Sequence, residues 1–381
     1  GWDVFLKARR MISGGINVTE LTIGEHDIRT AEPILQEMHK SALGGHTGYA
    51  MVPGTDDLRD VVAARVAART GVPTTRENVM ITPGGQSALF AAHAAACDPG
   101  DTALYIDPYY ATYPGTIRGV SAIPRAVPAY ASNAFQPATG PLAEAAAEGA
   151  VSLLINSPNN PTGVVYSRAT LEGIAAVCQE HDLWLISDEV YDTQVWEGTH
   201  LSPRALPSMA ERTLVVGSMS KSHAMTGSRC GWIVGPEAVI EHLVSFATHT
   251  TYGVPGYIQD ASVFALTQGD AFEAQIAAPF QRRRAIAQRV LLGLGRNASA
   301  PRLGPDMNPQ RRLHTGISEL RPKGGGGQQI PNPATIGQSH KDRGAAFEAA
   351  QPRIQITGPQ GGRLCQNCSH TRLRRGAEGG D

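Results

Sequence analysis

Short, almost wholly apolar runs alternate with longer amphipathic segments from the start of the chain to about residue 295. Such runs are typical of strands buried on both faces of a parallel sheet, and the segments between them suit the helical crossovers that parallel strands require. The sequence therefore predicts an α/β fold, with a mostly parallel central sheet flanked by helices and a smaller second domain. In such a sheet the ligand binds at the carboxyl ends of the strands. Strands are predicted at residues 79–82, 102–107, 151–156, 183–188 and 213–217, and helices at 86–97, 168–181 and 280–292.

The composition changes at about residue 296. From that point the chain has 13 Lys and Arg residues against 6 Asp and Glu, and Phe347 is its only Phe, Tyr or Trp. A segment so poor in large apolar side chains can bury little surface, so we expect it to be irregular or disordered. A reading frame lost shortly after residue 292 would explain the change. The expected division is an N-terminal segment at 1–35, a large domain at 36–285 and an atypical small domain at 286–381.

Charge and cysteine content restrict the partners and the compartment. The formal net charge is −1 and no long run of Lys or Arg occurs, which favours small-molecule substrates over nucleic acid or an anionic membrane. No apolar stretch long enough to span a membrane and no signal-peptide pattern is found, and five cysteines suit a reducing compartment, so we expect a cytoplasmic protein. Cys365 and Cys368 could be half of a zinc site, but no second pair at ligand spacing completes it and no metal is expected.

The cluster from Ser218 to Trp232 directly follows the fifth predicted strand. It contains Lys221, which at the mouth of the sheet could form an imine with an aldehyde. Arg229 follows eight residues later and could grip a phosphate through its planar guanidinium. A surface lysine and a solvated arginine are the alternative, and this cluster alone leaves both interpretations open.

Two further clusters follow the third and fourth predicted strands. Asp188 ends the fourth strand, where a buried carboxylate is costly unless it meets a cation such as a pyridinium N–H. Tyr191 comes three residues later and could hydrogen-bond a phenolate oxygen. The string Asn-Ser-Pro-Asn-Asn-Pro-Thr-Gly at 156–163 follows the third strand. Taken singly, an ordinary turn acid, a packed tyrosine and a plain loop explain these residues equally well.

Glycines form the fourth cluster, at the turn between the first predicted strand and the helix after it. Gly84 and Gly85 would let the backbone approach a phosphate, whose charge the helix N-terminus would meet. Tyr110, after the second strand, could stack on a flat heterocycle, although packing in the core is the commoner role of a tyrosine. The four clusters together supply what a single cofactor with an aldehyde, a ring nitrogen and a phosphate requires.

These motifs together resemble the class I and II aminotransferases, which are pyridoxal phosphate (PLP) enzymes of fold type I, and are most similar to the bacterial aspartate-aminotransferase-like branch. The resemblance covers roughly residues 15–290. It implies that Lys221 holds PLP as a Schiff base and then moves the proton, and that Asp188 keeps the pyridine nitrogen protonated. It also implies hydrogen bonds from Tyr191 and Asn160 to the 3′ oxygen of the ring. The remaining implied contacts are ring stacking by Tyr110, phosphate binding by Gly85, Gln86, Ser218, Ser220 and Arg229, phosphate binding by Tyr49 across a homodimer, and a substrate contact at Gly24.

The resemblance implies an aminotransferase that moves an amino group between an L-amino acid and a 2-oxo acid. A PLP-dependent β-lyase would use the same three catalytic residues. A polypeptide that binds PLP but is catalytically impaired is a further alternative, because nothing after residue 295 resembles the family. The family's arginine for the substrate α-carboxylate has only a weak counterpart in Arg353. No arginine for a distal carboxylate stands out, because residues 282–284 read as a solvated helix face, and the donor and acceptor stay open.

Overall fold

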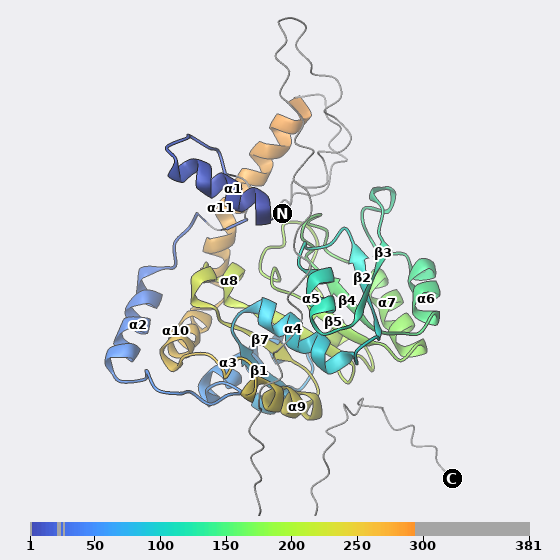
Figure 1. Ribbon diagram of the computed structural model, residues 1–381, viewed down its shortest axis with the longest axis horizontal. Helices are drawn as coiled ribbons and strands as arrows, with labels where there is room; N and C mark the ends of the chain where they lie inside the picture. The colour runs from blue at the N-terminus through green and yellow to red at the C-terminus, as the bar shows by residue number, and fades with distance from the viewer. Residues whose placement is uncertain (1, 21–23, 26, 294–381) are drawn as a thin grey trace, which may run out of the picture. The chain divides into compact units, whose positions relative to one another are not determined.

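A seven-stranded sheet with the order β1-β7-β6-β5-β4-β2-β3 lies at the centre of the computed structural model (Figure 1). The structure describes residues 2–20, 24–25 and 27–293, which all belong to one structural unit. The expectations about the basic tail, Arg353, Cys365 and Cys368 concern residues outside this described part. The strands are β1 (Val79–Thr82), β2 (Thr102–Asp107), β3 (Ile123–Pro128), β4 (Ala150–Asn156), β5 (Trp184–Asp188), β6 (Thr213–Ser218) and β7 (Gly231–Val234).

All five predicted strands are confirmed, each with bounds within one residue of those predicted, whereas β3 and β7 were not foreseen. Strands β2 to β6 pair in parallel, and β7 lies antiparallel between β1 and β6. The predicted mostly parallel sheet is therefore confirmed. Asn156 lies opposite Asp188 in the register, and Asp188 lies opposite Val216. The carboxyl ends of β4, β5 and β6 consequently meet at one edge of the sheet.

Helices cover both faces of this sheet (Figure 1). Val216 faces α4, because a Cβ added to Gly85 would lie 3.8 Å from its Cγ1 atom. The adjacent Val215 packs in the core cluster with α3 and α10, since successive strand residues point to opposite faces. The helices are α1 (Trp2–Ser13), α2 (Glu32–Leu43), α3 (Asp56–Thr70), α4 (Gly85–Ala96), α5 (Tyr113–Gly119), α6 (Thr139–Ala147), α7 (Arg168–Glu180), α8 (Met219–Ser222), α9 (Glu237–Thr248), α10 (Gly256–Thr267) and α11 (Gly269–Gly293).

Two apolar clusters hold the helices against the sheet. One joins α6 and α7 to β2, β4 and β5 through buried side chains such as Leu153 and Leu171. The other joins α3 and α10 to β1, β6 and β7 through side chains such as Leu58 and Ala261. Burying one leucine stabilises a fold by about 1.5–3 kcal/mol, so these clusters give the strand ends a rigid base. The predicted helix at 280–292 lies inside α11, which runs without a break through the expected domain boundary at residue 285.

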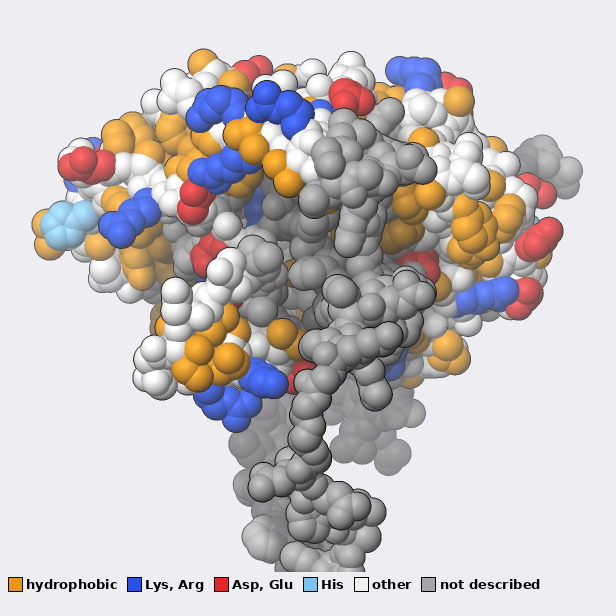
Figure 2. All heavy atoms as spheres, turned by 90° about the horizontal axis from the view of Figure 1, so that it is seen from above, with side chains coloured by type: hydrophobic (Ala, Val, Ile, Leu, Met, Phe, Trp, Pro, Cys, Tyr) orange, Lys and Arg blue, Asp and Glu red, His pale blue; other side chains and the backbone are white. Residues whose placement is uncertain are grey.

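The described surface is mixed in character. On the face shown in Figure 2, basic, acidic and hydrophobic side chains are interspersed. Of the helices in the described part of the chain, none has the length and apolar content needed to cross a membrane. Residues 2–293, apart from the short gaps in that range, also contain no group of three or more His, Cys, Asp or Glu that could hold a metal ion. The organised polar groups lie instead at the carboxyl ends of the strands.

Candidate active site

Asp188 ends β5 and is almost fully buried, with 3 % of its surface exposed. Its Oδ2 atom accepts a hydrogen bond from Tyr113 Oη at 2.7 Å, and its Oδ1 atom accepts one from the Val190 backbone N–H at 3.3 Å. Burial raises the pKa of the Asp188 carboxyl to about 6, although both hydrogen bonds act in the opposite direction. The nearby Glu189 contributes to the same rise. A neighbouring positive charge would therefore stabilise the ionised form of Asp188.

The turn after β4 is bonded directly to the end of β5. Asn156 Nδ2 donates to the Asp188 backbone carbonyl at 2.9 Å, and the Asn160 backbone N–H donates to Asn156 Oδ1 at 2.7 Å. These bonds place the Asn160 side chain beside Tyr191, and its Nδ2 atom donates to Tyr191 Oη over a long 3.4 Å. Asn160 Oδ1 is buried and has no hydrogen-bond partner among the described residues. The amide therefore has hydrogen-bonding capacity that the protein itself does not use.

Lys221 lies on the short helix α8, directly after β6. Its Nζ atom donates a hydrogen bond to the Gly24 carbonyl at 2.9 Å and lies 5.9 Å from the centre of the Tyr191 ring. Gln194 connects the two turns, because its backbone N–H donates to the Tyr191 carbonyl at 2.8 Å and its Nε2 atom donates to the Lys221 carbonyl at 3.2 Å. Gly24, Tyr191 and Lys221 are thus brought together from three distant parts of the sequence.

Arg229 packs against the glycine turn that precedes α4. A Cβ added to Gly84 would lie 2.4 Å from Arg229 Nη2, so only glycine leaves room for the guanidinium there. The same turn passes close to β7, because a Cβ on Gly231 would lie 2.9 Å from the Gly85 nitrogen. Gly84 is the N-cap residue of α4 and offers no side chain to the free N–H groups of the first turn. An arginine and an uncapped helix N-terminus, both attractive to an anion, therefore adjoin one another.

The other predicted residues differ in how closely they approach these groups. The Ser218 and Ser220 hydroxyls share a hydrogen bond of 3.0 Å at the start of α8. Gln86 uses its side chain to bond Thr112 and Thr116, so its backbone N–H is the group that faces the start of α4 as a donor for an anion. The remaining two are both exposed tyrosines: Tyr110 packs edge-on to Tyr113, with ring centres 5.8 Å apart, and Tyr49 packs edge-on to Tyr252, with ring centres 5.3 Å apart.

Sequence reasoning missed two polar residues of this site, Tyr113 and Gln194. It also missed that the Asn156 side chain bonds the end of β5. Each acts through a partner far along the chain, and Tyr113 is 75 positions from Asp188. Asn156 belongs to the motif at residues 156–163, but the motif alone does not indicate what its side chain does. Tyr113 and Gln194 lie outside every motif that points to the site. The sequence held one weak signal for Tyr113. It follows Tyr110, the predicted stacking residue, by three positions, and therefore lies close to the same strand ends.

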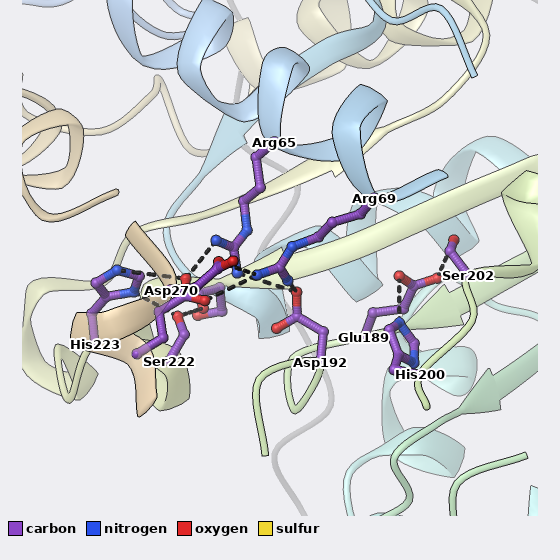
Figure 3. A network of polar contacts seen from close by, with 11 residues as sticks. Arg65, Arg69, Glu189, Asp192, His200, Ser202, Ser222, His223 and Asp270 are labelled. Carbon is purple, nitrogen blue, oxygen red and sulfur yellow. Dashed lines mark hydrogen bonds and ion pairs between the residues drawn. The ribbon is translucent and has the colours of Figure 1, made fainter. Parts of the chain in front are cut away.

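A second polar network lies beside the site and joins α3, the segment after β5 and α11 (Figure 3). Arg65 Nη1 pairs with Glu273 at 2.5 Å, and Arg69 pairs with both Glu273 and Asp192. A cavity of about 340 Å³ opens here and is lined by residues that include Arg65, Arg69, Asp192, His200 and Trp232. None of the predicted cofactor residues lines it, so this cavity is distinct from the group around Lys221.

One interpretation of the sequence is corrected here. Residues 282–284 were interpreted as a solvated helix face, but the Arg284 side chain is only 14 % exposed and pairs with Glu197 at 2.5 Å. The reason is tertiary, since Glu197, which lies between β5 and β6, meets the Arg284 side chain. Arg283 is about half exposed, and it forms two hydrogen bonds, of 2.8 and 2.7 Å, with Asp27.

Comparison with known proteins identifies the family. The sequence model of the family "Aminotransferase class I and II" matches residues 16–296. The arginine–pyruvate transaminase of Pseudomonas aeruginosa is 37 % identical over 323 residues, which cover 85 % of this chain and 80 % of that protein. The probable aspartate/prephenate aminotransferase of Thermus aquaticus is 35 % identical over 282 residues, which cover 74 % and 73 % of the two chains.

Solved structures agree with this assignment. Aspartate aminotransferase from Thermus thermophilus with maleate superposes with a TM-score of 0.74 at 33 % identity, over 77 % of each chain. Aspartate aminotransferase from Thermotoga maritima gives a TM-score of 0.72 at 31 % identity, over 77 % of this chain and 78 % of its own. The predicted α/β fold of the fold-type-I aminotransferases is thereby confirmed, and the chain belongs to the class I and II aminotransferases.

Proposed function

We propose that this aminotransferase binds PLP at the carboxyl ends of β4, β5 and β6, and that Lys221 holds the cofactor covalently. The observation that carries the proposal is Asp188, a buried carboxylate that forms no ion pair with any described residue. A protonated ring nitrogen would supply the missing positive charge. The position of the Asn160 amide supports the same proposal, because its Nδ2 atom carries two N–H groups and lies beside Tyr191 Oη, and the oxygen on the ring of PLP needs donors of this kind.

The glycine turn and its neighbours fit the phosphate of PLP. Gly85 and Gln86 would offer the free N–H groups at the start of α4, whose N-cap Gly84 provides no side-chain acceptor. Arg229 would add a guanidinium, and its close packing on Gly84 holds it beside those N–H groups. Ser218 and Ser220 would add hydroxyl donors from the start of α8. The positive end of α4, the Arg229 guanidinium and several hydrogen-bond donors together suit a doubly charged phosphate.

Bound there, PLP supplies the electrophilic carbon that takes up and returns the amino group, and a ring that accepts the electron pair of the Cα–H bond. The Lys221 amine would carry the proton as the general base, and its hydrogen bond to the Gly24 carbonyl keeps it at the site. Gly24 would lie against the substrate, and Tyr110 would cover the ring face. Asp188 would hold the ring nitrogen in its protonated form.

The substrates that we propose are an L-amino acid and a 2-oxo acid. The relatives include both an arginine–pyruvate transaminase and a probable aspartate/prephenate aminotransferase, so the family assignment alone leaves the donor and acceptor open. A β-lyase would use the same Lys221, Asp188 and Tyr191, but no contact among the described residues favours that reaction. Arg353, the candidate for the substrate α-carboxylate, lies outside the described residues.

A homodimer would complete the site. Tyr49 is 93 % exposed in the single chain, and Leu43, Met51 and Tyr252 on the neighbouring segments are exposed as well. Exposed large apolar side chains that lie near one another are typical of an interface. We propose that Tyr49 reaches the phosphate bound by the neighbouring subunit. We also propose the division at residues 35 and 285, and a cytoplasmic location, which the buried Cys97, Cys178 and Cys230 suit.

The test is an absorbance titration of the purified protein with PLP, followed by addition of amino acids. We expect the parent chain to show the visible band of PLP held by a lysine amine, and we expect Lys221→Ala to lose this band. Lys7→Ala is the matched control, because Lys7 is an exposed lysine on α1 that makes no contact in the site.

An amino acid that removes the band, followed by a 2-oxo acid that restores it, would demonstrate transfer of the amino group. A band that survives in Lys221→Ala would refute the role of this lysine. Release of pyruvate and ammonia from a β-substituted amino acid without any 2-oxo acid would instead indicate a lyase.

A further inference from the structure

Tyr113 and Asp188 form a buried hydrogen-bonded pair for which the roles assigned so far give no reason. Their exposed fractions are 2 % and 3 %, and Tyr113 Oη lies 2.7 Å from Asp188 Oδ2. The pair joins α5 to the end of β5, across the width of the site. A phenol hydroxyl directed at a carboxylate in a water-poor setting is one of the stronger hydrogen bonds a protein makes, because the acceptor carries charge.

The position of Tyr113 is set by a brace between α4 and α5. Gln86 in the first turn of α4 accepts a hydrogen bond from Thr112 Oγ1 at 2.9 Å and donates one to Thr116 Oγ1 at 2.7 Å. Tyr113, the first residue of α5, lies between these two threonines, and Tyr110 packs edge-on against its ring. The brace starts at the turn that we assign to the phosphate, so it ties the two ends of the cofactor site together.

The groups that face Asp188 act in opposite directions on its charge. Burial disfavours the carboxylate, and so does Glu189, the next residue along the chain. Two donors favour the carboxylate, namely Tyr113 from α5 and the Val190 N–H from the turn after β5. Burial and the negative Asp188 also raise the pKa of Tyr113 well above its ordinary value, so its hydroxyl stays a donor across the working pH range.

We propose that Tyr113 is a positioning residue for this reaction: its hydroxyl holds Asp188 ionised and in a fixed rotamer before the cofactor arrives. The proposal rests on the role given above to Asp188. Each carboxylate oxygen receives one donor from the protein, so Asp188 keeps lone-pair capacity for a third donor, the ring N–H. A carboxylate that is already charged and fixed does not have to be deprotonated or reoriented when the cofactor binds.

The experiment follows the titration of Asp188 in the cofactor-free protein by carbon NMR of labelled aspartate side chains. The Asp188 signal is identified by its loss in Asp188→Asn. In Tyr113→Phe we expect the titration midpoint of Asp188 to move upward by about one pH unit, because one hydrogen bond to the charged form is lost. Tyr166→Phe is the control, since Tyr166 is equally buried at 2 % exposed and makes no bond to Asp188.

A second variant, Thr116→Val, removes one bond of the brace and leaves the Tyr113 hydroxyl in place. We expect it to move the Asp188 midpoint in the same direction by a smaller amount. Tyr113→Phe should also bind PLP about tenfold more weakly than the parent chain, whereas Tyr166→Phe should bind PLP as tightly as the parent.

An Asp188 midpoint that is the same in Tyr113→Phe and the parent chain would overturn the inference, whatever the activity of either protein. Failure of the proposed function would look different, because PLP would then not bind even though the midpoint still moved. A midpoint shift together with weaker PLP binding supports both.

Discussion

At the scale of single residues, the site places a carboxylate where burial opposes its negative charge. Asp188 is almost fully buried, and its two hydrogen-bond donors only partly offset the cost of burying its charge. A residue of this kind lowers the stability of the empty protein and is retained for what it does with a ligand. The free energy of unfolding should therefore depend on the ionisation of Asp188.

The sign of that dependence follows from its pKa, which burial raises from 3.8 to about 6. The folded state binds the proton more tightly than the unfolded state, so stability falls as the pH rises from about 4 through 6. The full loss is about 3 kcal/mol for a shift of this size. In the absence of PLP we therefore expect Asp188→Asn to be more stable than the parent chain at pH 8, by up to this amount, and equally stable near pH 4.

Urea unfolding curves at the two pH values measure this difference directly. Asp182→Asn is the matched control, because that carboxylate is exposed and pairs with Arg212 at the surface, so its removal should change little at either pH. A parent chain that is the more stable of the two at pH 8 would show that the Asp188 charge is better compensated than its surroundings suggest.

At the scale of secondary-structure elements, α11 is tied to three separate segments by charged groups. Glu273, 5 % exposed, pairs with Arg65 and Arg69 of α3, while Arg283 and Arg284 pair with Asp27 and Glu197. The first of these contacts adjoins the catalytic turns, because Asp192 directly follows Tyr191 and also pairs with both arginines. These ion pairs fix α11 against the segment that carries Tyr191, and the contact between Glu273 and His223 fixes it against the segment that carries Lys221.

We expect Glu273→Gln to lower the free energy of unfolding by about 3 kcal/mol, because Glu273 is only 5 % exposed and pairs with both Arg65 and Arg69. Chemical denaturation of the cofactor-free protein measures the change. Glu148→Gln is the comparison, since Glu148 pairs with Arg125 on the surface and its loss should have no measurable effect. Equal effects of the two substitutions would mean that the buried network contributes no more than a surface ion pair.

At the scale of the whole molecule, the proposed homodimer predicts that two inactive chains can repair one another. Lys221→Ala lacks the cofactor lysine and Tyr49→Ala lacks the tyrosine that we assign to the neighbour's phosphate. A mixed dimer contains one site with both residues intact, so free exchange of subunits should restore roughly a quarter of the sites. Tight PLP binding, measured in the mixture and in each variant alone, tests this.

No recovery in a mixture that sedimentation shows to contain mixed dimers would place Tyr49 outside the neighbour's site. A chain that sediments as a monomer at all concentrations would contradict the dimer itself. The exposed Tyr252 offers a control, since Tyr252→Ala alters the same surface but should not be needed for the pairing of sites.

The sequence by itself determined five of the seven strands, the mostly parallel sheet and the family. Apolar runs such as residues 151–156 can only be buried strands, and Lys221, Asp188 and the glycine turn stand at their ends because strand ends are where a parallel sheet presents side chains. These inferences need only local patterns and their order. The short strand β7 escaped prediction because its four residues lie within the cluster that was read for its chemistry.

Only the tertiary structure decided which distant residues meet. The Tyr113 hydroxyl reaches Asp188 because Gln86 braces α5 against α4, and Arg284 is largely shielded from solvent where it pairs with Glu197 of the segment between β5 and β6. A tyrosine or an arginine has the same local pattern whether it faces water or a buried partner. What distinguishes the two cases is burial and the position of a partner dozens of residues away, and both arise only when the helices pack on the sheet.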